Sequence, residues 1–189
     1  VGYSYKASYA GGIVGYLENG KIVGADSDTA INTGNVSGEL IAGGIVGASI
    51  NGFFEKYLVN SGVIIKTKTG SVAGGIFGYT EDNTNVDKVD RYRNAGNVGD
   101  TSKTTIAGGI VGIYNGNNKK ELTKAYNGAD VIAGNNSKIK TIQNLTIKTV
   151  NNQVILNSSK TVYEPTEGVD LNAAGGIVGR HSGGSTIKN

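Results

Sequence analysis

Three pairs of closely spaced carboxylates are the residues of this 189-residue chain that best fit acid–base chemistry. Two carboxylates on one face of a strand could serve as acid and base on a glycosidic bond, and residues two apart share a face. Each pair, however, lies in a separate polar, turn-rich stretch, so we interpret all three as solvated loop residues and not as catalytic or calcium sites. The pairs are Asp26 and Asp28, Asp87 and Asp90, and Glu164 and Glu167.

Other apparent chemical motifs are equally incomplete. His181 is the only histidine and cysteine is absent, so a zinc site of nitrogen and sulfur ligands cannot form. Ser182 and Ser185 lie near His181, but nothing in the sequence supplies the third member of a catalytic triad. Residues 15–21 have the spacing of a phosphate loop, yet Ile22 follows where magnesium requires Ser or Thr. The sequence therefore predicts no catalytic residue, no metal site and no cofactor.

A short glycine-rich segment recurs along the chain and organises it. The pattern Ala-Gly-Gly-Ile-Val-Gly returns almost unchanged at residues 10–15, 42–47, 73–78, 107–112 and 174–179. Successive copies are 32, 31, 34 and then 67 residues apart. A period in this range is typical of stacked repeats that bury their apolar faces against one another. The last interval suggests two steps with a degenerate copy between them.

The composition favours strands in each repeat. The pattern places three glycines within five positions, and each costs about 1 kcal/mol in a helix interior, whereas its β-branched residues suit a pleated surface. Side chains of a strand alternate between its faces. We therefore expect Ile13, Ile45, Ile76, Ile110 and Ile177 to point inward and the residue after each to point outward. The predicted fold class is all-β, a β-solenoid of repeats about 31–34 residues long.

A second repeated element, Asn-x-Gly or a close variant, ends each unit at Asn32, Asn60, Asn94 and Asn127. In a solenoid these side chains would lie one above another, where amides can hydrogen-bond along the axis. A structural asparagine ladder is the favoured interpretation. The alternative is an exposed asparagine row that binds a ligand.

Residues 132–173 lack the repeat, and we predict a β-hairpin there. The β-prone runs 145–150 and 153–156 flank Asn151 and Asn152, which tolerate the positive φ of a tight turn. One alternative buries the hairpin as a degenerate rung of the core. The other lets it project or flank the stack, as an irregular insertion that is the predicted partner-binding place. The residues assigned to that place are Lys148, Gln153, Tyr163 and Glu164.

The domain prediction is a single repeat array over residues 1–189, excised from a longer chain. Its clear repeats span residues 10–131, and residues 174–189 form a last partial repeat. Lys and Arg exceed Asp and Glu by only 18 to 15, which argues against nucleic acid as the natural partner. No run of 18 apolar residues is present, so we expect no membrane insertion by this segment.

These motifs together resemble the GLUG repeat. The resemblance rests on Gly-Gly-Ile-Val-Gly, on Tyr16 and Tyr79 after it, and on the Asn-x-Gly-Asn-Val segments at Asn32 and Asn94. It covers residues 10–131 well, 174–184 in part and the interval between them hardly at all. The family's Leu is Ile here, and the second copy lacks the Tyr. The resemblance implies a β-helical stalk in a large bacterial surface or secreted protein, without catalytic residues.

Three functions follow as hypotheses. The first is a non-catalytic stalk or binding module of a bacterial cell-surface adhesin. Its partner would be a host or bacterial surface protein or glycan, and its location extracellular, at the cell surface or secreted. The second is a non-catalytic spacer or substrate-recognition region of a large secreted protease, a context that the resemblance also implies. The third is a β-helical carbohydrate-active enzyme that uses the surface carboxylates.

Overall fold

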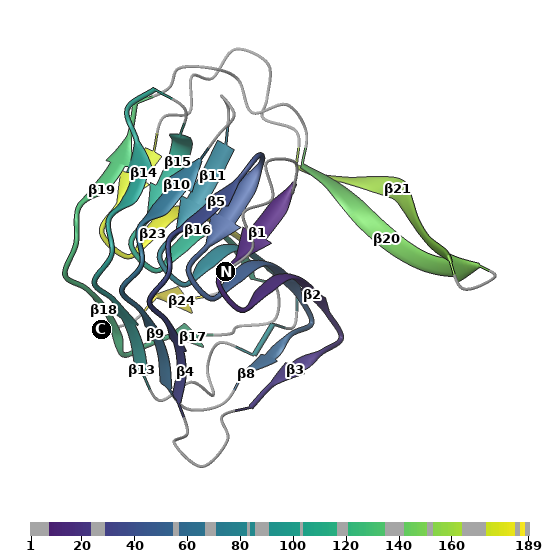
Figure 1. Ribbon diagram of the computed structural model, residues 1–189, viewed down its shortest axis with the longest axis horizontal. Coiled ribbons are helices and arrows are strands. Elements are labelled where there is room, and N and C mark those ends of the chain that lie inside the picture. Colours follow the sequence, from purple (N-terminus) through teal and green to yellow (C-terminus); the bar gives the residue numbers. More distant parts are fainter. Residues whose placement is uncertain are drawn as a thin grey trace.

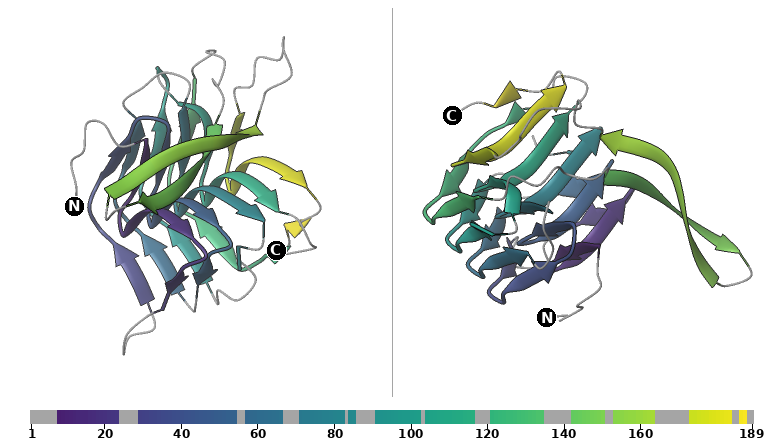
Figure 2. Two further views of the ribbon diagram at one scale, coloured as in Figure 1. Left: turned by 90° about the vertical axis from the view of Figure 1, so that its right-hand side faces the viewer. Right: turned by 90° about the horizontal axis from the view of Figure 1, so that it is seen from above.

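The computed structural model is an all-β solenoid built almost entirely from parallel strands (Figure 1), which confirms the predicted fold class. Successive coils stack in chain order, as the colour sequence in Figure 2 shows. The structure describes residues 8–23, 29–54, 57–66, 71–82, 84–85, 91–102, 104–116, 121–134, 142–150, 153–163, 173–183 and 186–187.

Two five-stranded parallel sheets meet along the Gly-Gly corner of each coil. Sheet 1 stacks β1 (Tyr9–Gly11), β6 (Ile41–Gly43), β11 (Ser71–Gly74), β15 (Thr104–Gly108) and β22 (Ala173–Gly175). Sheet 2 stacks β2 (Val14–Glu18), β7 (Val46–Ile50), β12 (Phe77–Asp82), β16 (Val111–Gly116) and β23 (Val178–Gly183). Their register pairs each repeat with the next, for example Ala10 with Ala42 and Ala42 with Ala73.

Two four-stranded parallel sheets complete the coil. Sheet 3 stacks β4 (Thr29–Asn32), β9 (Tyr57–Asn60), β13 (Arg91–Asn94) and β18 (Ala125–Asn127). Sheet 4 stacks β5 (Val36–Gly38), β10 (Ile64–Lys66), β14 (Val98–Asp100) and β19 (Val131–Ala133). Between sheets 2 and 3 lie two short parallel pairs. They are β3 (Lys21–Ile22) with β8 (Phe53–Phe54), and β17 (Glu121–Leu122) with β24 (Thr186–Ile187).

The predicted hairpin is present as β20 (Ile142–Val150) and β21 (Gln153–Tyr163), which pair antiparallel with each other. It extends away from the stack (Figures 1 and 2). Strand β22 pairs directly with β15, with Ala174 beside Ala107. The expectation of a degenerate copy inside the 67-residue step is therefore wrong, because the coil at Ala174 stacks on the coil at Ala107. The hairpin interrupts the chain between two neighbouring coils and adds no rung.

The Gly-Gly-Ile-Val-Gly segment is a corner, which corrects the predicted orientation of its apolar residues. The second glycine and the Ile form a bend between sheets 1 and 2. Both Ile45 N and Val46 N donate to the carbonyl oxygen of Ile76 in the next coil, at 2.9 and 3.0 Å. Because the chain bends here, the alternation of a regular strand does not apply, and both Ile45 and Val46 are fully buried. In the first coil Ile13 is 45% exposed.

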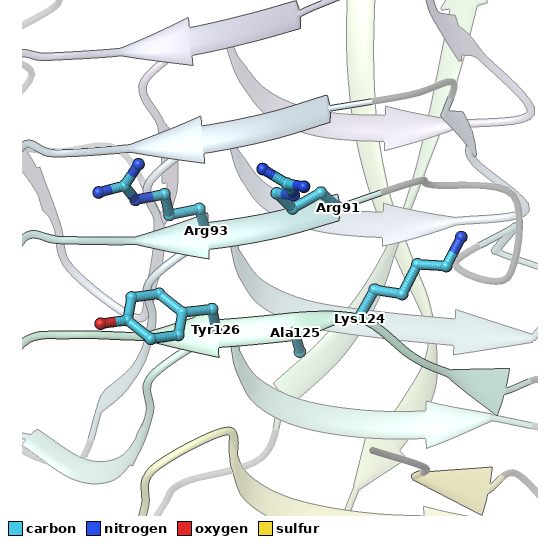
Figure 3. Close-up of a pocket in the computed structure, with 5 residues that line it drawn as sticks. All are labelled: Arg91, Arg93, Lys124, Ala125 and Tyr126. Carbon is cyan, nitrogen blue, oxygen red and sulfur yellow. The ribbon is translucent and has the colours of Figure 1, made fainter.

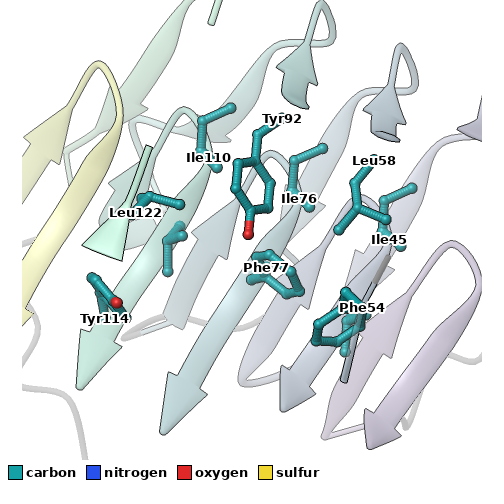
Figure 4. Close-up of a cluster of buried hydrophobic side chains, with 11 residues drawn as sticks. Ile45, Phe54, Leu58, Ile76, Phe77, Tyr92, Ile110, Tyr114 and Leu122 are labelled. Carbon is teal, nitrogen blue, oxygen red and sulfur yellow. The ribbon is translucent and has the colours of Figure 1, made fainter. Parts of the chain in front are cut away.

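Buried apolar side chains form three clusters, one of them made by strands of sheets 1 and 2. The other two fill separate parts of the interior. The larger lies behind sheets 2 and 3 and contains the aromatic residues Phe54, Phe77 and Tyr92, stacked edge to face with centroids 5.0 and 5.9 Å apart (Figure 4). The smaller lies between sheets 1 and 4 and holds mainly Ala and Val side chains, such as Ala73 and Val98. Small residues suit it because those two sheets approach closely.

The predicted asparagine ladder is confirmed. Each side-chain Nδ2 donates to Oδ1 of the next asparagine, from Asn32 to Asn60 at 2.8 Å, Asn60 to Asn94 at 2.8 Å and Asn94 to Asn127 at 2.7 Å. Each Nδ2 also donates to the carbonyl two residues later, as Asn60 does to Gly62 at 2.8 Å. Asn60 and Asn94 are fully buried and Asn32 is 5% exposed. The alternative of an exposed ligand-binding row is therefore wrong.

The second corner glycine of each coil packs against the ladder. A Cβ on Gly75 would collide with the carbonyl oxygen of Gly109 in the next coil and with the side chain of Asn94 in its own. Gly75 has no positive φ, so the need for glycine there comes from this close approach. Gly176, at the equivalent position of the last coil, has no atom within 4 Å of such a Cβ. The Gly-Gly corner and the asparagine bend of one coil are therefore in contact across the interior.

We expect Gly75→Ala to lower the free energy of unfolding by about 1–3 kcal/mol, because the added methyl group overpacks the corner. Gly176→Ala is the matched control and should leave stability nearly unchanged, because its methyl group enters open space. Urea denaturation of both variants measures the difference. Equal stability of the two variants would contradict the proposed corner contact.

The ladder has a direction, which a pair of Asn→Asp variants can test. Asn60→Asp removes the donor to Asn94 and Gly62 and turns a carboxylate oxygen toward those acceptors, so we expect a loss above about 3 kcal/mol or failure to fold. Asn127 Oδ1 accepts from Asn94, and its Nδ2 donates to the carbonyl oxygen of Ala129 at the end of the ladder. Asn127→Asp keeps the acceptor and should cost much less. The order of the two thermal midpoints is the readout.

Candidate binding surface

The residues predicted to bind a partner are spread along the hairpin. Lys148 and Gln153 lie near its tip, where Val150 pairs with Gln153. Tyr163 lies at its base, paired with Ile142. About ten residues of strand, at roughly 3.3 Å each, separate the two ends. Glu164 lies outside the described residues. The structure therefore does not bring Lys148 and Gln153 together with Tyr163, and their binding role stays a prediction.

The carboxylate pairs, His181 and the loop-like segment 15–21 do not come together in a site among the described residues. The carboxylate pairs Asp26/Asp28, Asp87/Asp90 and Glu164/Glu167 all lie outside the described residues. His181 is exposed in β23 and its ring lies 5.5 Å from that of Tyr114. Residues 15–21 form most of β2, a turn and the start of β3, a strand arrangement unlike a phosphate loop before a helix. Among the described residues, no group of three metal-ligating side chains is found.

A cluster of basic and aromatic side chains lies on the outer surface of sheet 3. In β13, Tyr92 and Asn94 point inward and are buried, so Arg91 and Arg93 point outward and are exposed. The same alternation in β9 leaves Tyr57 36% exposed. Tyr126 of β18 is 58% exposed. We call Tyr57, Arg91, Arg93, Lys124 and Tyr126 the basic–aromatic face.

Parallel register arranges the outer surface of sheet 3 in two columns. Arg91 pairs with Tyr57, and Lys124, directly before β18, continues that column. Arg93 pairs with Tyr126 in the second column (Figure 3). Neighbouring coils are about 4.8 Å apart and residues two apart on a strand about 6.6 Å. Neither column contains an acidic residue. In stacking order they are Thr29, Tyr57, Arg91 and Lys124, and Ile31, Val59, Arg93 and Tyr126.

Local contacts hold this face in place. The guanidinium carbon of Arg91 lies 5.4 Å from the centroid of the Tyr57 ring, a cation–π distance. Lys124 has a φ of 54°, in the left-handed region that non-glycine residues seldom occupy, and its carbonyl oxygen accepts from Tyr92 N at 3.2 Å. Arg91, Arg93 and Lys124, with Ala125 and Tyr126, line an open depression of about 500 Å³ (Figure 3).

A second polar cluster lies at the junction of sheets 1 and 2 and is tied together internally. The Tyr79 hydroxyl donates to Glu81 at 2.8 Å and the Tyr16 hydroxyl to Glu18 at 3.4 Å. Burial, aided by the charge of Glu81, raises the pKa of Tyr9 to about 12. Burial, followed by the nearby Glu18, also raises the pKa of Tyr16. Both phenols therefore stay protonated at physiological pH, and the Tyr16 hydroxyl is a donor to Glu18.

The sequence contains a signal for the basic–aromatic face in the spacing of residues before each ladder asparagine. Each ladder asparagine points inward, so the residues one and three positions before it must point outward. Counting back from Asn94 gives Arg93 and Arg91, and counting back from Asn127 gives Tyr126 and Lys124. The register that places these residues side by side follows from the ladder itself.

Comparisons with known proteins find no relative of this chain from which a function could be proposed. No protein-family model matches the chain, and neither a curated protein nor a solved structure matches it significantly. The GLUG resemblance therefore remains a prediction from the motifs. Among the described residues, none belongs to a helix long and apolar enough to cross a membrane.

Deleting residues 144–158 tests what the hairpin does. The deletion joins Gln143 to Ser159, so that Ser159 and Lys160 close a two-residue loop beneath the Gln143–Thr161 pair. Because β20 and β21 pair with each other and with no other described strand, we expect the shortened chain to fold with an unchanged thermal midpoint. Loss of partner binding in the folded variant would support the predicted role of Lys148 and Gln153, and unchanged binding would contradict it.

Proposed function

We propose that this chain is a non-catalytic repeat stalk and binding module of a bacterial cell-surface adhesin, located outside the cell. Its partner would be a host or bacterial surface protein or glycan. The observation that carries the proposal is the basic–aromatic face, where exposed cations and aromatic rings from successive coils gather on one flat sheet. Arg and Tyr, which supply four of the five residues of this face, are enriched at binding surfaces.

The division of labour between inward and outward residues supports the stalk role. Inward positions repeat from coil to coil, as with Ile45, Ile76 and Ile110 at the corner, and their polar members are used in the ladder. Outward positions of sheet 3 differ in every coil. A scaffold of this kind can vary its surface without changing its core, and its concatenated coils make an extended rigid body.

Adhesion by the displayed chain tests the proposal. We expect beads coated with the folded chain to attach to host cells or to bacterial surface material, and soluble chain in excess to compete with them. Beads coated with Gly75→Val, a variant whose corner packing is disrupted, should attach less.

Two results would contradict the proposal. One is equal attachment by the folded chain and by a denatured chain, which would make adhesion independent of the surface described here. The other is turnover of a polysaccharide or peptide substrate by the purified chain, since a binding module should release its ligand unchanged.

A further inference from the structure

We propose that the basic–aromatic face binds a carboxylate-bearing polysaccharide, a chain of uronic-acid type, laid across the strands of sheet 3. This assignment rests on the proposed binding function and names the class of ligand. It is carried by the juxtaposition of Arg91 and Arg93 on one strand with Lys124 and Tyr126 on the next and Tyr57 on the one before.

The shape of the face suits a polymer. The depression of about 500 Å³ is open along the sheet and is lined by side chains of β13 and β18 with Lys124. Small metabolites usually bind in pockets that bury most of their surface. A polymer instead gains affinity by touching a flat surface at several points, each weak by itself. Arg91, Arg93 and Lys124 provide such points at spacings of about 5–7 Å, set by the strand lattice.

The chemistry of the side chains favours carboxylates. A guanidinium group presents parallel N–H donors that match the two oxygens of a carboxylate. Among the described residues, the two outward columns of sheet 3 carry three cations and no carboxylate, so the columns themselves present positive charge. The Tyr57 ring under Arg91 orients that guanidinium before a ligand arrives, which lowers the entropic cost of binding.

The tyrosines favour a sugar chain over other polyanions. Tyr126 exposes 58% of its surface, enough for the apolar C–H face of a sugar ring to pack on the phenol while its hydroxyl remains in water. A nucleic acid is less well served, because three cations neutralise few phosphates and the net charge of the chain is only +3. Tyr57 and Tyr126 also lie two coils apart, too far to stack on successive bases.

Binding of the whole chain to defined polymers tests the assignment. Polygalacturonate is the main probe. Poly-glutamate supplies carboxylates without sugar rings, dextran supplies sugar rings without charge, heparin supplies sulfates, and oligo-dT supplies phosphates with bases. We expect the affinity for polygalacturonate to exceed that for each other polymer by about tenfold or more, and to fall as salt rises.

Substitutions connect the binding to the face. The double variant Arg91→Gln/Arg93→Gln and the single variant Tyr126→Ala should each lower the affinity for polygalacturonate about tenfold or more. Arg93→Lys should lose part of it, because an ammonium group lacks the planar fork. Lys21→Gln is the matched control. Lys21 is also a cation beside an aromatic ring, with its Nζ 4.8 Å from the Phe53 ring, but both residues belong to the β3–β8 pair and lie outside sheet 3. The affinity of Lys21→Gln should be unchanged, and thermal midpoints confirm that all variants fold.

The assignment is overturned by absence of polygalacturonate binding, by equal or tighter binding of poly-glutamate, heparin or oligo-dT, or by the same loss in Lys21→Gln as in the double variant. The adhesion assay separates this from the broader proposal. If the double variant loses polygalacturonate binding but its beads attach like the wild type, the attachment function stands and another surface of the chain is responsible for it. In that case a polysaccharide bound at the basic–aromatic face is not the ligand that mediates attachment.

Discussion

The contact between the Gly-Gly corner and the asparagine ladder is the constraint on which the rest of the solenoid depends. In each inner coil, the second corner glycine lies against the ladder asparagine of the same coil and beneath a carbonyl of the next. A larger residue in place of the glycine would collide with this carbonyl and with the asparagine. A side chain without the amide donor in place of Asn60 would lose the bonds to Asn94 and Gly62. This pinched cross-section separates the aromatic core behind sheets 2 and 3 from the small-residue core between sheets 1 and 4.

The ladder also transmits register from coil to coil. Because Asn60 must donate to Asn94 and Asn32 to Asn60, each coil is aligned with its neighbours regardless of how many residues lie between the asparagines. That tolerance explains how repeats of unequal length coexist in one stack. The ladder ends at Asn127, so register across the long insertion depends on the parallel backbone pairing of β15 with β22 and of β16 with β23.

The same register produces the outward surface. Once Asn94 is directed inward, alternation directs Arg91 and Arg93 outward, and the coils on either side place Tyr57 and Tyr126 beside them. The interior is indifferent to what these positions carry, so they can be selected for binding alone. The proposed polysaccharide site is therefore a product of the scaffold's regularity combined with freedom at its exterior.

The repeated spacing determined the fold class, the stacking of the asparagines and the position of the hairpin. Each of these depends on local sequence pattern and on a repeat length that recurs several times along the chain. Tertiary structure decided three further points. The bend at the Gly-Gly corner buries both Ile45 and Val46, which strand alternation alone forbids. Direct pairing of β15 with β22 shows that the 67-residue step adds only one coil.

The third point is the candidate site. The departure of the hairpin residues from the repeat predicts a binding place there, yet antiparallel register separates Tyr163 from Gln153 by the length of the strands. The basic–aromatic face was missed because its residues are scattered along the sequence, and Arg93 and Tyr126 become neighbours only through pairing across a whole coil. The amino-acid composition gives the numbers of basic and aromatic residues but not their positions on the surface. The stacking of coils places these residues side by side on sheet 3.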